Sequence, residues 1–140
     1  MKVKEFLKGI EKKEHAIQHL EDLIDKIKAM AEYKGVAINP NGGGSGNRDE
    51  DRMATYMCKA VDLENRLVRI KEQYNDDIER ATMMILNISD GKTLQVMWMR
   101  YVKYQKWETI ASDLDITYQW TLKLHGRGLE ELQKKYPEFS

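Results

Sequence analysis

The sequence contains few residues that would cross-link or interrupt a helical chain. It has one cysteine and two prolines among 140 residues, and its strand-favouring runs are short. A single cysteine cannot form an internal disulfide or a multi-cysteine zinc site. The neighbours of Cys58 indicate a helix, so we expect Cys58 to be a small, semi-buried side chain there. The composition therefore predicts an all-α fold.

Long hydrophobic runs and an excess of charge of one sign are also missing. No window of the sequence approaches the roughly 20 apolar residues of a membrane span, so we expect a cytosolic protein with no membrane partner. The 23 Lys and Arg balance 23 Asp and Glu, which argues against a protein that coats nucleic acid indiscriminately. Residues 92–140 carry eight Lys or Arg against six Asp or Glu, and this small local excess suits specific DNA binding.

Apolar residues recur in alternating steps of three and four along two long segments. They predict one helix over most of residues 3–34 and a second from about 49 to 88. Lys13 interrupts the first apolar seam and Asp77 interrupts the second. The first seam comprises Val3, Phe6, Ile10, Ile17, Leu20, Ile24, Ile27 and Ala31; the second comprises Tyr56, Ala60, Leu63, Leu67, Ile70, Tyr74, Ala81, Met84 and Ile88.

The segment between the two helices, at about 35–48, contains Pro40 and a cluster of glycines. These residues stop the first helix and let the chain reverse, so we expect a long antiparallel, coiled-coil-like helical hairpin over residues 1–90. A phosphate-binding loop is disfavoured, because no strand precedes the glycines and no Gly-Lys-Ser/Thr ending follows them. A helix of about 35 residues spans roughly 50 Å, which is far longer than the C-terminal helices can cover. We therefore expect the hairpin to form a homodimer, with a hairpin closed on itself as the alternative.

The sequence from Trp107 to Leu132, WETIASDLDITYQWTLKLHGRGLEEL, fits two short helices that cross at a tight turn. Asp115 occupies the turn, where the backbone usually needs a residue that tolerates the left-handed conformation, and Thr117 is placed to cap the second helix. Leu94–Tyr101 predicts a further short helix before them. Inward-facing positions are expected at Ile110, Ala111, Leu114, Ile116, Trp120, Thr121, Leu124, Gly128 and Leu132. We interpret residues 91–140 as a helix-turn-helix domain that binds double-stranded DNA.

Four residues of the second helix, Tyr118, Gln119, Leu122 and Lys123, face outward in this pattern. In the major groove, Gln pairs well with adenine and Lys with guanine, so Gln119 and Lys123 are candidates for reading base edges. Tyr118 and Leu122 are placed to touch thymine methyls or sugars. Arg127 and Lys106 are placed for phosphates on either side. The alternative interpretation is that all of these are ordinary solvent-facing residues of a helical bundle.

The order helix, loop, helix, turn and longer helix resembles region 4 of bacterial sigma-70 factors. ETIASDLDIT is similar to its first helix and turn, and TLKLHGRGLEEL is similar to its recognition helix. Together with the Gly-rich loop and the VDLENRL segment, RYVKYQKWETIASDLDIT and LHGRGLEEL resemble small sigma-like regulators of phages and prophages of Gram-positive bacteria, including late-transcription activators of the ArpU and RinA type.

The resemblance implies a transcriptional regulator in which residues 118, 119, 122 and 123 face the bases. It also implies that the start of the preceding helix, near Lys106 and Trp107, meets the DNA backbone. Two mechanisms fit: binding upstream of a late promoter, or contact with host RNA polymerase. Gly128 stands where the pattern often has Ala, and close approach of two helices explains a small residue there.

Two other functions fit the same elements. A phage small terminase subunit also joins a helix-turn-helix to a coiled coil and marks viral DNA for packaging, and an inhibitor would use the same fold as a protein-interaction module. No nucleophile with a nearby base is evident, so we expect no enzyme activity and no cofactor. His15 and His19 have a spacing that can hold a metal, but no third ligand is evident, so we expect a solvated helix face and no metal site.

Overall fold

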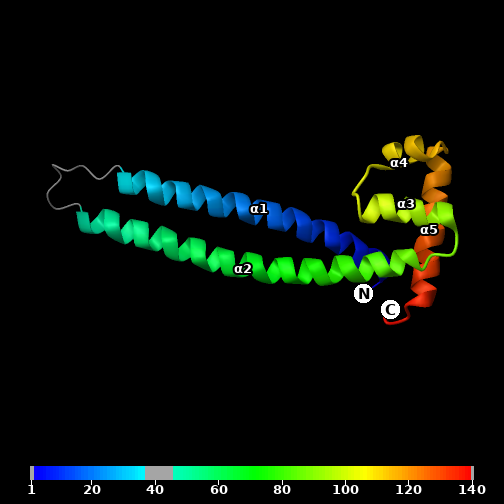
Figure 1. Cartoon of the computed structure of the whole chain (residues 1–140), viewed down its shortest axis with the longest axis horizontal. Coiled ribbons are helices and arrows are strands. Elements are labelled where there is room, and N and C mark those ends of the chain that lie inside the picture. Colours follow the sequence, from blue (N-terminus) through cyan, green and yellow to red (C-terminus); the bar gives the residue numbers. More distant parts are fainter. Residues whose placement is uncertain (1, 37–45, 140) are drawn as a thin grey trace. The chain divides into compact units, whose positions relative to one another are not determined.

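The computed structural model describes residues 2–36 and 46–139, and within them the chain forms helices and no strands (Figure 1). The all-α prediction is confirmed. The predicted loop at about 35–48 lies largely outside the described residues. The five helices are α1 (Val3–Val36), α2 (Gly46–Leu86), α3 (Gly91–Tyr101), α4 (Trp107–Leu114) and α5 (Tyr118–Lys135).

The chain divides into two compact units. Unit 1 comprises Met1–Glu14 with Tyr74–Ser140, and unit 2 comprises His15–Gln73. This division differs from the predicted boundary at residue 90. The reason is that the first turns of α1 and the last turns of α2 share a core with α3 and α5.

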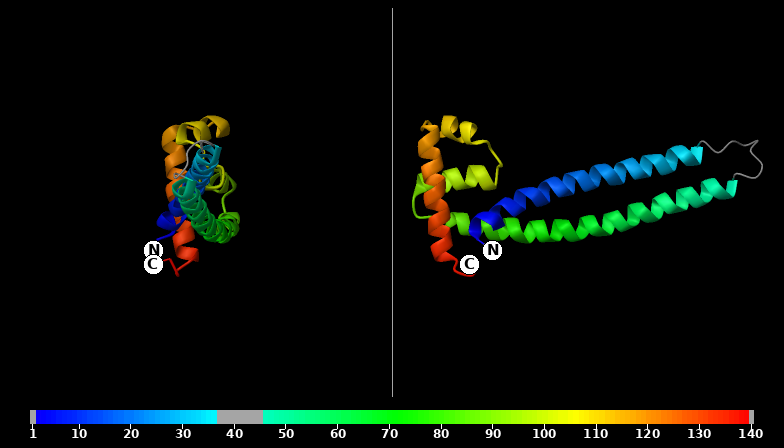
Figure 2. Two further views of the ribbon diagram at one scale, coloured as in Figure 1. Left: turned by 90° about the vertical axis from the view of Figure 1, so that its left-hand side faces the viewer. Right: turned by 180° about the vertical axis from the view of Figure 1, so that it is seen from behind.

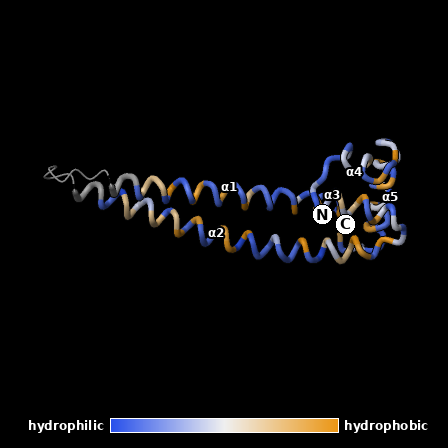
Figure 3. Tube along the Cα trace, turned by 45° about the horizontal axis from the view of Figure 1, so that its top comes forward, coloured by the Kyte–Doolittle hydropathy of each residue, from blue (hydrophilic) through white to orange (hydrophobic). Residues whose placement is uncertain are grey.

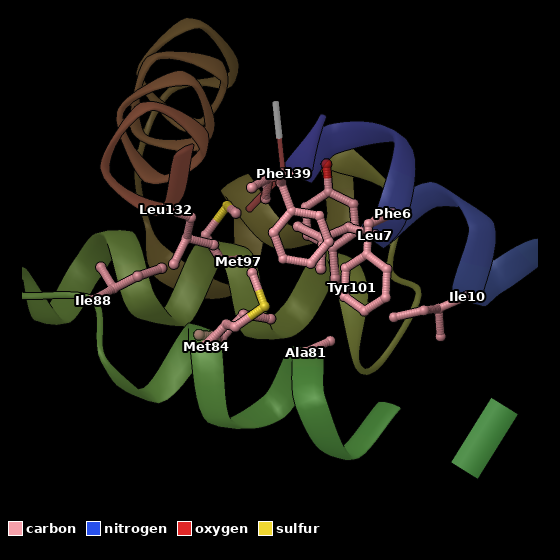
Figure 4. Close-up of a cluster of buried hydrophobic side chains, with 12 residues drawn as sticks. Phe6, Leu7, Ile10, Ala81, Met84, Ile88, Met97, Tyr101, Leu132 and Phe139 are labelled. Carbon is pink, nitrogen blue, oxygen red and sulfur yellow. The ribbon is translucent and has the colours of Figure 1, made fainter. Parts of the chain in front are cut away.

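The main core of unit 1 draws on five segments of the chain (Figure 4). Leu7 of α1 and Ile85 of α2 are fully buried although neither belongs to the apolar seams, because both helices are covered on more than one side here. Each such side chain contributes roughly 1.5–3 kcal/mol on burial. The buried members are Val3, Phe6, Leu7, Ile10, Ala81, Met84, Ile85, Ile88, Met97, Tyr101, Leu132 and Phe139.

The C-terminal tail closes this core. The Phe139 ring lies 4.9 Å from the Phe6 ring, and the Arg80 guanidinium lies 4.5 Å from the Phe139 ring. Arg80 also pairs with Glu138 at 3.1 Å. The amide oxygen of Gln133 accepts a hydrogen bond from the backbone N–H of Val3 at 3.0 Å. Residues at both ends of the sequence are therefore part of one folded unit.

A buried stripe on α5, formed by Thr121, Leu124, Gly128 and Leu132, joins α5 to the other helices of unit 1. Leu124 packs in a second apolar cluster with Val96 of α3 and Ile110 of α4. At Gly128, an added Cβ would lie 2.7 Å from the Cγ of Met97 and 3.2 Å from a methyl of Thr93. The close approach that explains Gly128 is therefore with α3. Figure 2 shows α4 beside the first turns of α5 and α3 further along it.

Unit 2 consists of parts of α1 and α2 that lie side by side with opposite chain directions (Figures 1 and 2). Ile24, Ala31 and Ala60 are buried between them, and Figure 3 shows apolar positions recurring along both helices. Two ion pairs, Lys28 with Glu64 and Lys71 with Glu21, link the helices. Such exposed pairs contribute about 0–1 kcal/mol each, so the apolar seam provides most of the stabilisation.

Cys58 is exposed, and the expectation that it is semi-buried is wrong. It lies two residues before the buried Ala60 and therefore about 160° away around the helix. Over the described ranges, no helix combines the length and the apolarity needed to cross a membrane.

The two glycines of α5 should respond oppositely to substitution. Gly128→Val places carbon atoms in space that the buried Met97 occupies, so we expect a loss of about 2 kcal/mol or more in the free energy of unfolding. Gly126 has open space around its Cβ position, so Gly126→Ala should raise that free energy by up to about 1 kcal/mol through helix propensity. Urea unfolding measures both changes, and equal effects at the two positions would contradict the packing at Gly128.

Candidate nucleic-acid interface

The turn between α4 and α5 is built around Asp115, which adopts the left-handed conformation with φ 54° and ψ 49°. Its backbone N–H donates to the carbonyl oxygens of Ala111 and Ser112, and the N–H of Ile116 donates to Ala111 at 3.0 Å. These bonds satisfy carbonyl groups at the end of α4 that have no partner within the helix. The prediction for Asp115 is confirmed.

Thr117 caps the start of α5, as predicted. Its hydroxyl oxygen accepts a hydrogen bond from the N–H of Trp120 at 3.0 Å, and such caps stabilise a helix by about 1 kcal/mol. The Thr121 hydroxyl donates to the Thr117 carbonyl at 2.9 Å and is fully buried. Turn, cap and buried stripe together fix which side of α5 faces away from the core.

The four predicted base-reading residues lie on that outer side. Tyr118, Gln119, Leu122 and Lys123 are all exposed on the first two turns of α5, with Tyr118 at 42% and Leu122 at 38%. Two large apolar or aromatic side chains thus lie beside an amide and an ammonium group on one exposed ridge.

Trp120 is exposed, and the prediction that it lies in the core is wrong. It lies about 100° around the helix from the buried Thr121, at the edge of the stripe that faces α3 and α4. The Arg127 guanidinium covers one face of its ring, at 4.9 Å from the ring centre. Arg127 is exposed as expected, but it is held by Trp120 and lies further along α5 than the four residues of the ridge.

Lys106 and Trp107 stand at the start of α4 in different surroundings. Lys106 is the exposed N-cap residue and makes no side-chain capping bond. Trp107 is half-buried, with its ring 4.5 Å from the His125 ring and 4.5 Å from the Arg100 guanidinium. The Lys106 side chain is therefore exposed to solvent, whereas Trp107 is part of a packed cluster.

His125 is the residue of this cluster whose role the sequence did not reveal. Its Nε2 lies 2.5 Å from the hydroxyl of Tyr101. Burial, followed by the charges of Lys4, Arg100 and Lys8, lowers the pKa of His125 from 6.5 to about 4. Burial raises the pKa of Tyr101 to about 12. At neutral pH the imidazole is therefore neutral, and its Nε2 shares a hydrogen bond with the Tyr101 hydroxyl.

A cavity of about 260 Å³ opens beside His125 within unit 1. Lys4 and Lys8 of α1, Arg100 of α3 and Leu122 of α5 line it. Sequence reasoning missed this grouping, because only the fold brings α1 beside α5. The i, i+4 spacing of Lys4 and Lys8 was the one local signal that the two side chains share a face.

The two histidines with possible metal spacing, His15 and His19, are both exposed. In the part of the chain that the structure describes, no three His, Cys, Asp or Glu side chains gather as a metal site would require. The groups around His125 form a cluster of polar and aromatic side chains beside α5.

The lowered pKa of His125 predicts a specific pH dependence of stability. The unfolded chain binds a proton near pH 6.5, whereas the folded chain binds it only near pH 4, so the folded state loses stability as pH falls through this range. From pH 7 to pH 5 the loss should be about 2 kcal/mol. In His125→Gln, which keeps a hydrogen-bonding group beside Tyr101, this part of the loss should vanish in urea unfolding at the two pH values. An equal loss in both proteins would show that His125 is not buried in the neutral form.

Comparisons with models of protein families, with curated proteins and with solved structures found no significant match to this chain. What unit 1 does must therefore be inferred from its own geometry.

Proposed function

We propose that this chain is a sequence-specific DNA-binding transcriptional regulator, sigma-like and of phage or prophage type. In this proposal the first two turns of α5 enter the major groove of promoter DNA. The turn at Asp115 and the cap at Thr117 hold α5 across α4, which is the relation between the two helices of a helix-turn-helix reader.

The observation that carries the proposal is the exposed ridge at the start of α5. Recognition helices present their N-terminal residues to base edges, and here those residues combine hydrogen-bonding and apolar groups. Gln119 has an amide that matches adenine, and Lys123 has an ammonium that matches guanine. Tyr118 and Leu122 are exposed beside them and contact thymine methyls or sugars.

Phosphate contacts flank the ridge in this proposal. Lys106 lies at the start of α4 and Arg127 on the third turn of α5, and both side chains are exposed. The stacking of Arg127 on Trp120 holds its guanidinium in a fixed direction, which lowers the entropy lost when it binds a phosphate. The regulator then acts either from a site upstream of the promoter or through contact with host RNA polymerase.

The assembly element of the proposal is unit 2, which pairs with a second copy of the chain. Two apolar stripes with heptad spacing are exposed on it: Leu23 and Met30 on α1, and Val61 and Val68 on α2. Residues 15–73 carry nine Lys or Arg and ten Asp or Glu, so net charge does not oppose pairing. Heptad stripes of this kind favour helix association into a bundle.

Removing the two candidate base-reading groups should abolish sequence selectivity. In Gln119→Ala with Lys123→Ala, the hydrogen bonds to the bases are lost, each good bidentate contact being worth about 1–3 kcal/mol of discrimination. Wild type should select a motif from a random duplex library at near-physiological salt, and the double variant should select none while its helicity is unchanged.

The matched control changes the same residue types on unit 2, at the exposed Gln18 and Lys26. Gln18→Ala with Lys26→Ala should select the wild-type motif. Arg127→Ala should weaken binding to all duplexes alike, since a phosphate contact carries no base information. Failure of the wild-type protein to enrich any motif would refute the proposed function.

Charges placed on the exposed stripe of α2 should prevent assembly. Val61 and Val68 are 51% and 54% exposed in the single chain, and Val61→Glu with Val68→Glu would put four carboxylates into the dimer interface. We expect a dimer for wild type and a monomer for the variant in sedimentation at micromolar concentration. Thr55→Glu with Gln73→Glu adds the same charge to exposed positions about a third of a turn away and should stay dimeric. A monomeric wild type would contradict the assembly proposal.

A further inference from the structure

The cavity beside His125 has a strongly positive lining. Lys4, Lys8 and Arg100 contribute three cations, whereas Glu11 contributes one carboxylate. Over the described residues, none of the three cations lies within 4 Å of a carboxylate oxygen, although six other Lys and Arg do. A concave site in which cations outnumber carboxylates attracts an anion, because low-dielectric walls focus the field.

The groups of this cavity are also held in position. Arg100 donates a hydrogen bond to the carbonyl oxygen of Gln105 at 3.0 Å and stacks 4.5 Å from the Trp107 ring. His125 is fixed by the Tyr101 hydroxyl on one side and by the edge contact with Trp107 on the other. Lys4 and Lys8 are exposed and line the same cavity. The site therefore combines two groups held by hydrogen bonds, Arg100 and His125, with two exposed cations.

We propose that this cavity binds a phosphate group of the DNA backbone, with Lys4, Lys8 and Arg100 neutralising its charge. Leu122 lines the cavity and also belongs to the exposed ridge of α5, so a duplex on the ridge brings a phosphate to the cavity. The inference rests on the proposed function and extends it, because α1 then takes part in DNA binding as well as in assembly.

His125 reports on the occupancy of the cavity. The groups that face it are Lys4, Lys8 and Glu11 of α1, Arg100 and Tyr101 of α3, and Trp107 of α4. A bound phosphate offsets the cations that, after burial, hold the pKa of His125 down. The pKa should therefore rise in the complex. Imidazole NMR signals of His125 can follow this change in the full-length protein.

The test compares the salt dependence of duplex binding in wild type and in Lys4→Gln with Lys8→Gln. The slope of log K against log salt concentration is negative, and loss of one phosphate contact should reduce its magnitude by about 1. The selected motif should not change. The control, Lys26→Gln with Arg66→Gln, removes two exposed cations of unit 2 and should keep the wild-type slope. In NMR titrations, the duplex should raise the pKa of His125 in wild type and leave it unchanged in Lys4→Gln with Lys8→Gln.

The outcomes separate this inference from the proposed function. Motif selection with an unchanged salt slope in the Lys4 and Lys8 variant would overturn the inference and leave the proposed function standing. Absence of any duplex binding by wild type would overturn both. A second experiment titrates the protein with inorganic phosphate alone. If phosphate shifts the His125 signals while the salt slope of duplex binding is unchanged in the Lys4 and Lys8 variant, the cavity binds a free anion. That result would overturn the proposal that it binds a phosphate of the DNA backbone.

Discussion

The seating of α5 on α3 is the constraint on which the rest of unit 1 depends. Gly128 lets the two helices approach until Met97 fills the space where a side chain would otherwise lie, and Leu124 continues the contact toward α4. The side chains of a helix project at fixed angles around its axis, so burying this stripe of α5 also determines which residues of α5 are exposed on the opposite face. The exposure of Gln119 and Lys123 therefore follows from a packing contact on the other side of the same helix.

Local features of the fold could be read from the sequence because they depend on neighbouring residues. The left-handed turn at Asp115 and the cap at Thr117 need only a few residues of context. The exposure of Trp120 could not be predicted in this way, since Trp120 lies next to the buried stripe of α5 and only the packing of α5 decides which side of that stripe is covered. Leu7 and Ile85 were missed for a related reason: a heptad seam assumes one partner helix, whereas unit 1 surrounds them.

The candidate site likewise has one part that the sequence predicts and one part that it does not. The exposed ridge of α5 follows from helical periodicity, and all four of its predicted residues lie on the surface. The cavity beside it joins Lys4 and Lys8 to His125, which lie more than a hundred positions apart in the chain. No spacing rule relates such residues; only the shared core of α1 with α3 and α5 brings them together.

The two charged residues that interrupt the apolar seams turn out to be partners. Lys13 of α1 and Asp77 of α2 form an ion pair in which both side chains are half-buried. A smooth apolar seam would tolerate sliding of one helix past the other by a turn, about 5.4 Å. Such slippage would separate the two charges, so that each half-buried group would lose its counter-ion. The pair therefore acts as a register lock, which favours one alignment of α1 and α2 by penalising the others.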